Sequence, residues 1–361
     1  MAIELEMKKD NNHKTFALTR RSGINLLIAF LVSVVAIVVI VLFTISDKTL
    51  IAIQQVKVIY LIIAFLLTIL SYFLSGLTFS ILASALHKRL SVWQSFEVFS
   101  GANFIGLTAP FHIANMPVQA LFLNNFGISY ADATAIVTTH AVLSAWFFAV
   151  VTPFIFIFNI PLFGTPLSVA FFTALIVIIV STALFILFIL RPNFFEKAVT
   201  VIINSRLLKR FINPKELQRF SADTVEYMKN SNLSLKKLFK ASPFSLLLAF
   251  LSQILAWIAI IATAPIILIG LNWFDSLLEI FFRVMILNFF LSFSPIPGGS
   301  GIAEVGIFAA TLDLIPTFLI GPLVLLWRFT TFYLIYGVSA FFFVWLINMR
   351  AKMKKKKKIK S

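Results

Sequence analysis

Long uncharged stretches alternate with clusters of Lys and Arg along the whole chain, and this alternation constrains the fold more than any other feature. Segment 24–46 contains no charged residue, and its length suits the roughly 20 residues that a helix needs to cross about 30 Å of hydrocarbon. Hydrophobic residues make up 60% of the 361 positions and charged residues 12%. The sequence therefore predicts an all-α polytopic membrane protein.

The basic residues lie mainly in four clusters, and the formal net charge of the whole chain is +16. The clusters are the N-terminus up to Arg21, the turn 87–89, segment 191–242 and the tail from Arg350. This is the distribution that the positive-inside rule gives to cytoplasmic loops, and it is not a single basic surface for nucleic acid. Both termini are therefore expected in the cytoplasm, with the chain in the cell membrane.

The uncharged stretches predict about six full spans within one transmembrane domain, 24–347. Segment 24–46 is longer than the apolar core of a signal peptide, so it is predicted to be a mature span. A cytoplasmic segment, 1–23, precedes the domain, and a polybasic cytoplasmic tail, 348–361, follows it; the tail is expected to be disordered and to lie near anionic lipid. The predicted spans are 24–46, 58–86, 131–158, 167–190, 244–271 and 317–347.

The cytoplasmic loop 191–242 has an amphipathic pattern. Apolar residues between Phe194 and Ile212 form a broad helical stripe beside basic residues, as in a helix that lies in the membrane interface. Asn213 and Pro214 then predict the start of a second helix. Two interpretations remain open for this loop: a lipid-recruiting surface, or a solvated connector.

Two broken segments lie between the predicted spans and carry the same residue pattern 185 positions apart. Asn103-Phe104, Pro110 and Gln119 occur in the first, and Asn288-Phe289, Pro295 and Glu304 in the second. The loop assignments place both ends of the first inside and both ends of the second outside. This predicts an inverted repeat of two re-entrant hairpins that meet near the midplane, as in secondary transporters. Complete short spans, with a count of eight, are the alternative.

The second break contains the more specific motif. Pro295 and Pro297 end the incoming helix, while Gly298, Gly299 and Gly301 permit positive φ. Successive N–H groups in such a loop can form an anion-binding nest, and a helix that resumes near Ile302 adds its positive end. A phosphate headgroup is the predicted guest.

Two ionisable residues near this loop are predicted to form an ion pair. Glu304 falls in the first turn of the resumed helix, and Arg328 reaches a similar depth in the last span, where each charge needs a partner. The alternative is that Glu304 caps its own helix with Gly301 at the N-cap, while Arg328 bonds a loop carbonyl. Glu279 and Arg283 form an i,i+4 pair assigned to the outer interface.

The first break offers Pro110, His112 and Gln119 as candidate transport residues. Its prolines have no glycine between them, so its loop is expected to be stiffer than the second. His112 is a donor to a phosphate or a proton carrier near neutral pH; the alternative is a bond to a carbonyl at a helix end.

Several kinds of chemistry find no support in the residues. The chain has no cysteine, and its four histidines lack metal-ligand spacing. No cofactor, no metal and no catalytic residue is therefore predicted.

Beyond these patterns, the second break resembles the flippase-like transmembrane domain of lysylphosphatidylglycerol synthases and their YbhN-type stand-alone relatives. The residues that carry the resemblance are Pro295-x-Pro297-Gly298-Gly299-x-Gly301-x-x-Glu304, followed by Trp327-Arg328 in the last span. Pro110, Phe111, Pro117 and Gln119 match the family's first motif, in which Ala114 and Asn115 replace paired glycines. The resemblance implies movement of aminoacylated or other phospholipids between leaflets.

Three functions are therefore weighed. The preferred one is a lipid flippase, for a phospholipid such as lysyl-phosphatidylglycerol. A phosphatidylglycerol lysyltransferase is the second, although about 50 loop residues are too few for an aqueous acyltransferase fold. The third is a non-transporting membrane partner of a separate synthase.

Overall fold

The computed structural model describes most of the chain between residues 47 and 360, together with a short N-terminal part. The predicted span 24–46 falls outside the described residues except for Val38, and so do the turn 159–166 and most of 167–178. The described ranges are 7–10, 13–16, 38, 47–109, 112, 114–157, 176, 179–180, 182–203, 214–292 and 294–360.

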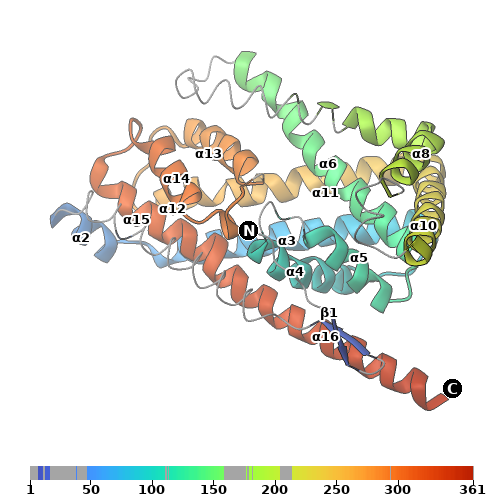
Figure 1. Ribbon diagram of the computed structural model, residues 1–361. Coiled ribbons are helices and arrows are strands. Elements are labelled where there is room, and N and C mark those ends of the chain that lie inside the picture. The colour runs from blue at the N-terminus through green and yellow to red at the C-terminus, as the bar shows by residue number, and fades with distance from the viewer. Residues whose placement is uncertain are drawn as a thin grey trace.

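The regular structure in these ranges is helical, apart from one small antiparallel sheet (Figure 1). Strands β1 (Met7–Asp10) and β2 (His13–Phe16) pair with Met7 opposite Phe16. Among the described residues, three helices are long and apolar enough to cross a membrane: Val58–Ala85, Pro243–Gly270 and Thr317–Ala351. The helical membrane class is confirmed.

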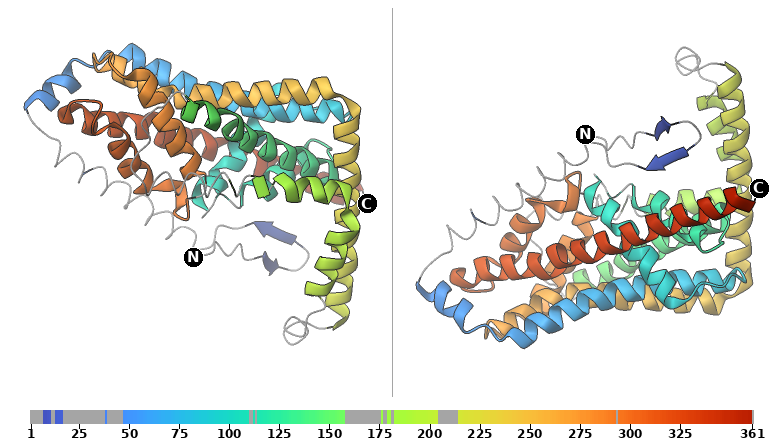
Figure 2. Two further views of the ribbon diagram at one scale, coloured as in Figure 1. Left: turned by 90° about the horizontal axis from the view of Figure 1, so that it is seen from above. Right: turned by 90° about the horizontal axis from the view of Figure 1, so that it is seen from below.

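Two of these helices run side by side along the length of the molecule (Figure 2). One is α3 (Val58–Ala85), and the other consists of α11 (Pro243–Ile261) continued by α12 (Thr263–Gly270). Ser242 caps α11 by accepting a hydrogen bond from the Ser245 N–H, and Pro243 occupies the first turn, where its missing donor costs nothing. The bounds agree with the predicted spans 58–86 and 244–271.

The last span continues well past its predicted end. Helix α15 (Thr317–Arg328) passes through a π-helical turn, η3 (Phe329–Tyr333), into α16 (Leu334–Lys360). The prediction of a disordered tail is wrong, because the backbone stays helical to Lys360. Lys has a good helix propensity and the tail contains no Gly or Pro, so nothing in it ends the helix.

Each predicted broken segment consists of two short helices. The first contains α4 (Val92–Thr108) and α5 (Asn115–Asn125); the second contains α13 (Leu277–Leu291), the 3₁₀ turn η2 (Pro297–Gly299) and α14 (Ile302–Thr311). In Figures 1 and 2, α13 and α14 lie toward the end of the molecule that carries α2 (Asp47–Gln54). Helices α4 and α5 lie toward the opposite end.

Helix α10 (Pro214–Ala241) crosses that opposite end, as Figure 2 shows. It begins at the predicted Pro214, and α8 (Pro192–Ile203) precedes it. Leu235 and Leu238 are fully buried, and Ser234 Oγ donates to Asp132 Oδ1 at 2.7 Å, at the start of α6 (Tyr130–Ile157). This helix is thus packed against the transmembrane domain, which does not fit a solvated connector.

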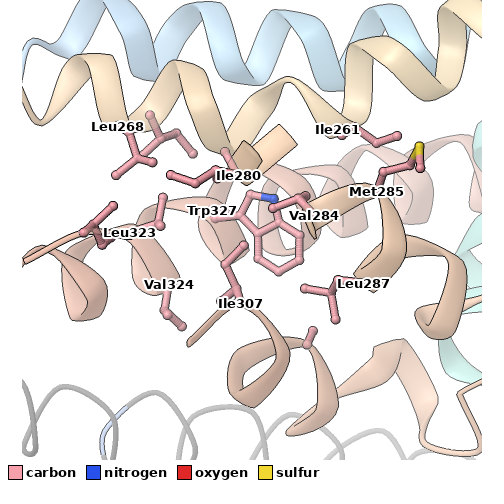
Figure 3. Packing of buried hydrophobic residues seen from close by; sticks show 14 of the residues in the cluster. Ile261, Leu268, Ile280, Val284, Met285, Leu287, Ile307, Leu323, Val324 and Trp327 are labelled. Carbon is pink, nitrogen blue, oxygen red and sulfur yellow. The ribbon is translucent and has the colours of Figure 1, made fainter. Parts of the chain in front are cut away.

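Buried apolar side chains form two clusters. One joins α12, α13 and α15 around Trp327, whose ring lies among Ile280, Val284 and Ile307 (Figure 3). The other joins α3, α4, α5 and α6 with α16 around Phe79 and Phe122. Residues of both clusters line one cavity, so the cavity lies where the two clusters meet, and α3, α6 and α11 contribute to both.

Candidate functional site

A cavity of about 710 Å³ opens where the two broken segments meet. It is bounded by α3, α4, α5, α6, α11, α13, η2 and the end of α15. Its polar lining residues are Ser71, Tyr72, Ser75, Asn103, His112, Asn115, Gln119, His140, Ser144, Gln253, Asn288, Ser292, Arg328 and Thr331. Fourteen polar side chains in the interior of a membrane protein mark a path or a binding site for a polar guest.

The tips of the two breaks approach each other directly. A Cβ added to Gly298 in the second break would lie 3.6 Å from the carbonyl oxygen of Leu107 in the first. The same Cβ would overlap the ring of Phe332, and Gly298 has φ +62°. Only glycine meets both demands, a left-handed backbone and a close approach, so this position is determined by local conformation and by packing together.

The predicted pair between Glu304 and Arg328 is confirmed. The Nε of Arg328 lies 2.8 Å from Oε1 of Glu304, with side-chain exposures of 4% and 0%. Arg328 also donates from Nη1 to the Gly298 carbonyl at 3.2 Å and stacks on Phe332, 4.3 Å from the ring centroid. These contacts tie the last span to the loop of the second break.

The alternative roles of these two residues are present at the same time. Gly301 is the N-cap of α14, with φ +84°, and its N–H donates to Glu304 Oε2 at 2.7 Å. One carboxylate therefore caps its own helix through Oε2 and pairs with Arg328 through Oε1. Because both oxygens are used, the start of α14 and the end of α15 are held in fixed positions relative to each other.

The prediction of an open anion-binding nest in this loop is wrong for three of its N–H groups. Gly299 N donates to Ile296 O at 2.9 Å, Ser300 N donates to Pro297 O at 3.3 Å, and Gly301 N is taken by Glu304. The positive φ values of Gly298, Gly299 and Gly301 let the loop turn back on itself and satisfy its own donors. The charged group at the cavity beside this break is instead the guanidinium of Arg328, which comes from α15.

The first break contributes neutral polar groups. Asn115 Nδ2 donates to Asn103 Oδ1 at 3.2 Å, which joins the two helices across the break, and Gln119 is 3% exposed at the cavity. His112 has φ +52°, lines the cavity, and its Nδ1 is buried without a partner among the described residues. Pro110 lies outside the described residues.

The predicted site residues therefore divide into two groups. His112, Gln119, Gly298, Gly299 and Arg328 line the cavity. The others belong to the loop of the second break or to the start of α14 and do not line the cavity: Pro295, Pro297, Gly301 and Glu304.

The sequence did not predict the polar group that α6 and α11 contribute to the cavity wall. Ser144 Oγ accepts hydrogen bonds from Trp257 Nε1 at 2.9 Å and from Gln253 Nε2 at 3.2 Å. Ser71 and Ser75 add hydroxyl groups from α3. A signal existed, because Gln253 is the one amide within the uncharged span 244–271, and Ser71 and Ser75 stand four positions apart on one helix face.

The assigned interface pair also has a third member. Arg283 contacts Glu279 at 2.6 Å and, through Nη1, Asp313 at 2.5 Å, and it donates to the Ala310 carbonyl at 3.2 Å. Its hydrogen bonds hold the pKa of the Asp313 carboxyl below its ordinary value. This cluster joins α13 to the end of α14, so it ties together the two ends of the second hairpin that lie away from its loop.

Comparison with known proteins identifies the relatives of this chain. It is 26% identical over 310 residues to a UPF0104 membrane protein from Archaeoglobus fulgidus, an alignment that covers 85% of this chain and 92% of that protein. No solved structure matches it. The family described as "Lysylphosphatidylglycerol synthase TM region" matches residues 26–339. With the paired glutamate and arginine beside a glycine-lined break, and a match across nearly the whole membrane domain, the chain belongs to the family of lysylphosphatidylglycerol synthase transmembrane regions.

Proposed function

We propose that this protein moves a phospholipid between the two leaflets of the cell membrane by carrying its headgroup through the central cavity. The observation that carries the proposal is the cavity itself, which is lined by both breaks and by Arg328. A polar headgroup crosses hydrocarbon slowly because it loses its hydrogen bonds to water. Serines, amides and a guanidinium along the path replace those bonds.

The size of the cavity suits this guest. About 710 Å³ falls within the range of roughly 300–1,000 Å³ typical of small-molecule sites. A phospholipid headgroup is comparable to such molecules, while its acyl chains remain in the surrounding bilayer. The path therefore needs to shield only the headgroup from hydrocarbon.

The arrangement of the breaks supports alternating access. Helices α5, α13 and α14 contain 11, 15 and 10 residues, fewer than the roughly 17 needed to span hydrocarbon, and α4, with 17, is at that limit. Two such hairpins that enter from opposite ends and meet at a cavity are the usual scaffold of inverted-repeat transporters. Movement of one half against the other would expose the cavity to each side in turn.

The family description names lysylphosphatidylglycerol, so this lipid and its unmodified parent, phosphatidylglycerol, are the candidate guests. A second lipid contact belongs to the proposal as well. The basic end of α16, from Arg350 onward, would lie at the cytoplasmic leaflet and attract anionic lipid there.

The proposal is tested by reconstituting the purified protein into liposomes with a headgroup-labelled phospholipid in both leaflets. A membrane-impermeant quencher should reach about half of the label in protein-free vesicles and nearly all of it when the protein is active. Quenching of the second half of the label then reports translocation. Met116→Trp, which adds volume at the cavity wall, should slow that quenching. Leu66→Trp, on the exposed face of α3, should not slow it. Equal quenching with and without the protein would exclude translocation of the lipid tried.

A further inference from the structure

We propose that the cavity selects a phosphate headgroup without an added ammonium group, so that phosphatidylglycerol is a better guest than its lysylated form. This inference rests on the proposed function and specifies its substrate. It is based on where the carboxylates of the chain lie, because an ammonium group in a low-dielectric cavity needs an acidic partner.

None of the described residues that line the cavity is an Asp or a Glu. The undescribed segments 17–37, 39–46, 110–111, 113, 158–175, 177–178, 181, 204–213 and 293 contain no acidic residue in the sequence either. The fourteen carboxylates of the chain are Glu4, Glu6, Asp10, Asp47, Glu97, Asp132, Glu196, Glu216, Asp223, Glu226, Asp275, Glu279, Glu304 and Asp313.

Among the described residues, none of these carboxylates lines the cavity, and several of them hold partners elsewhere. Asp132 lies with Lys88 and Ser234 at the end that α10 crosses, and Glu196 pairs with Lys229. Glu279 and Asp313 hold Arg283 at the outer end of the second hairpin. The carboxylate next to the cavity is that of Glu304, and it is fully buried behind its partner.

The pair between Arg328 and Glu304 is neutral as a whole but is oriented. Arg328 lines the cavity, whereas Glu304 does not, and one Glu304 oxygen is bound by the N–H of Gly301. A guest in the cavity therefore meets the positive end of the pair first. This orientation attracts a phosphate and repels an ammonium group, and the low dielectric of the site strengthens both effects.

Several aromatic residues at the cavity are already engaged with other groups and give an ammonium group little compensation. Phe332 already stacks under Arg328. Phe148 packs against Trp257 at 4.7 Å and against Phe289 at 4.9 Å between ring centroids. Cation–π contacts with these rings would require the packing between them to open.

The test compares translocation of phosphatidylglycerol and lysyl-phosphatidylglycerol with identical acyl chains, in liposomes that contain the purified full-length protein. We expect phosphatidylglycerol to move at least about tenfold faster, because the added ammonium group would be brought close to the Arg328 guanidinium in a buried site. Uptake of inorganic phosphate forms a third arm. Transport of phosphate without transport of either lipid would identify a free anion as the guest and overturn the lipid preference.

Asn103→Asp provides a variant that should change the preference. Asn103 Oδ1 accepts the hydrogen bond from Asn115, and an aspartate oxygen can accept the same bond while adding a negative charge to the lining. The ratio of lysylated to unmodified lipid transport should rise about tenfold or more. Gln94→Glu is the matched control: it adds the same charge to α4 within the Ser91 capping box, outside the lining, and should leave the ratio unchanged.

A binding measurement separates this inference from the proposed function. Each lipid is added to the detergent-solubilised protein, and its binding is measured by the quenching of tryptophan fluorescence. Tighter binding of phosphatidylglycerol supports the inference even if neither lipid is translocated, in which case the transport proposal fails alone. Equal or tighter binding of the lysylated lipid would overturn the inference. The inference would also be overturned if Asn103→Asp left the ratio of lysylated to unmodified lipid transport at its wild-type value.

Discussion

The Nε of Arg328 lies 2.8 Å from Oε1 of Glu304 beside the second break, and both side chains are buried. These residues come from α15 and from the first turn of α14, which are separated by the loop 312–316. Because Arg328 also bonds the Gly298 carbonyl, one guanidinium holds both the loop and the helix that follows it. The position of the charge at the cavity therefore depends on the conformation of the break.

Replacing Glu304 by glutamine should strongly destabilise the protein. Glutamine can still accept the Gly301 N–H, but Arg328 would be left buried without its carboxylate. We expect a loss of about 3–5 kcal/mol, measured as a lower thermal unfolding temperature in detergent. The double variant Glu304→Gln/Arg328→Gln removes both charges and should recover part of the loss. A single variant that unfolds at the wild-type temperature would show that the pair contributes no stability.

Gly298→Ala should cost more than the same change at another glycine with positive φ. Gly127 has φ +83° and open space around an added Cβ, so Gly127→Ala should cost only the backbone strain, about 1 kcal/mol. Gly298→Ala adds the overlap with Phe332 and should cost roughly 1–3 kcal/mol more. Thermal unfolding of both variants measures the difference, and equal losses would mean that Phe332 moves away freely.

Acid should weaken the outer cluster around Arg283. The pKa of Asp313 is lowered by its hydrogen bonds from Arg283, so the pair stabilises the folded state above the ordinary carboxyl pKa of about 3.9. That contribution is lost as the pH falls through the lower folded-state pKa. The effect should be modest, because the Asp313 side chain is 63% exposed.

The measurement compares the unfolding temperatures of the wild type and Asp313→Asn between neutral pH and about pH 3. The variant should be less stable at neutral pH and should approach the wild type in acid. A stability difference that stays constant across this range would show that Asp313 does not titrate with folding.

The absence of cysteine allows the sidedness of the two breaks to be tested with single cysteines. Arg89 and Asp275 are both exposed, the first before α4 and the second before α13. If the breaks open to opposite sides, an impermeant maleimide added to intact cells should label Asp275→Cys and leave Arg89→Cys unlabelled. Labelling of Arg89→Cys after the cells are permeabilised is the control. Equal labelling of both in intact cells would contradict the inverted arrangement.

The sequence by itself determined the features that depend on neighbouring residues. Uncharged stretches located α3, α6 and the continuous helix 243–270 within a residue or two, because burial in a membrane requires long apolar helices. Three glycines predicted the positive φ values of the second loop, and Gly301 and Glu304 predicted how α14 begins. The failure at the tail was also local: net charge suggested disorder, but helix propensity continued α16.

The tertiary structure alone decided which groups face the cavity. The sequence offered the loop N–H groups to a phosphate, but the folded loop uses three of them internally, because its glycines turn the chain back toward its own carbonyls. It also predicted a pair between Glu304 and Arg328 without indicating which partner lines the cavity. That orientation, and the wall formed by Ser144 and Gln253, depend on how helices far apart in the chain pack together, which no local pattern contains.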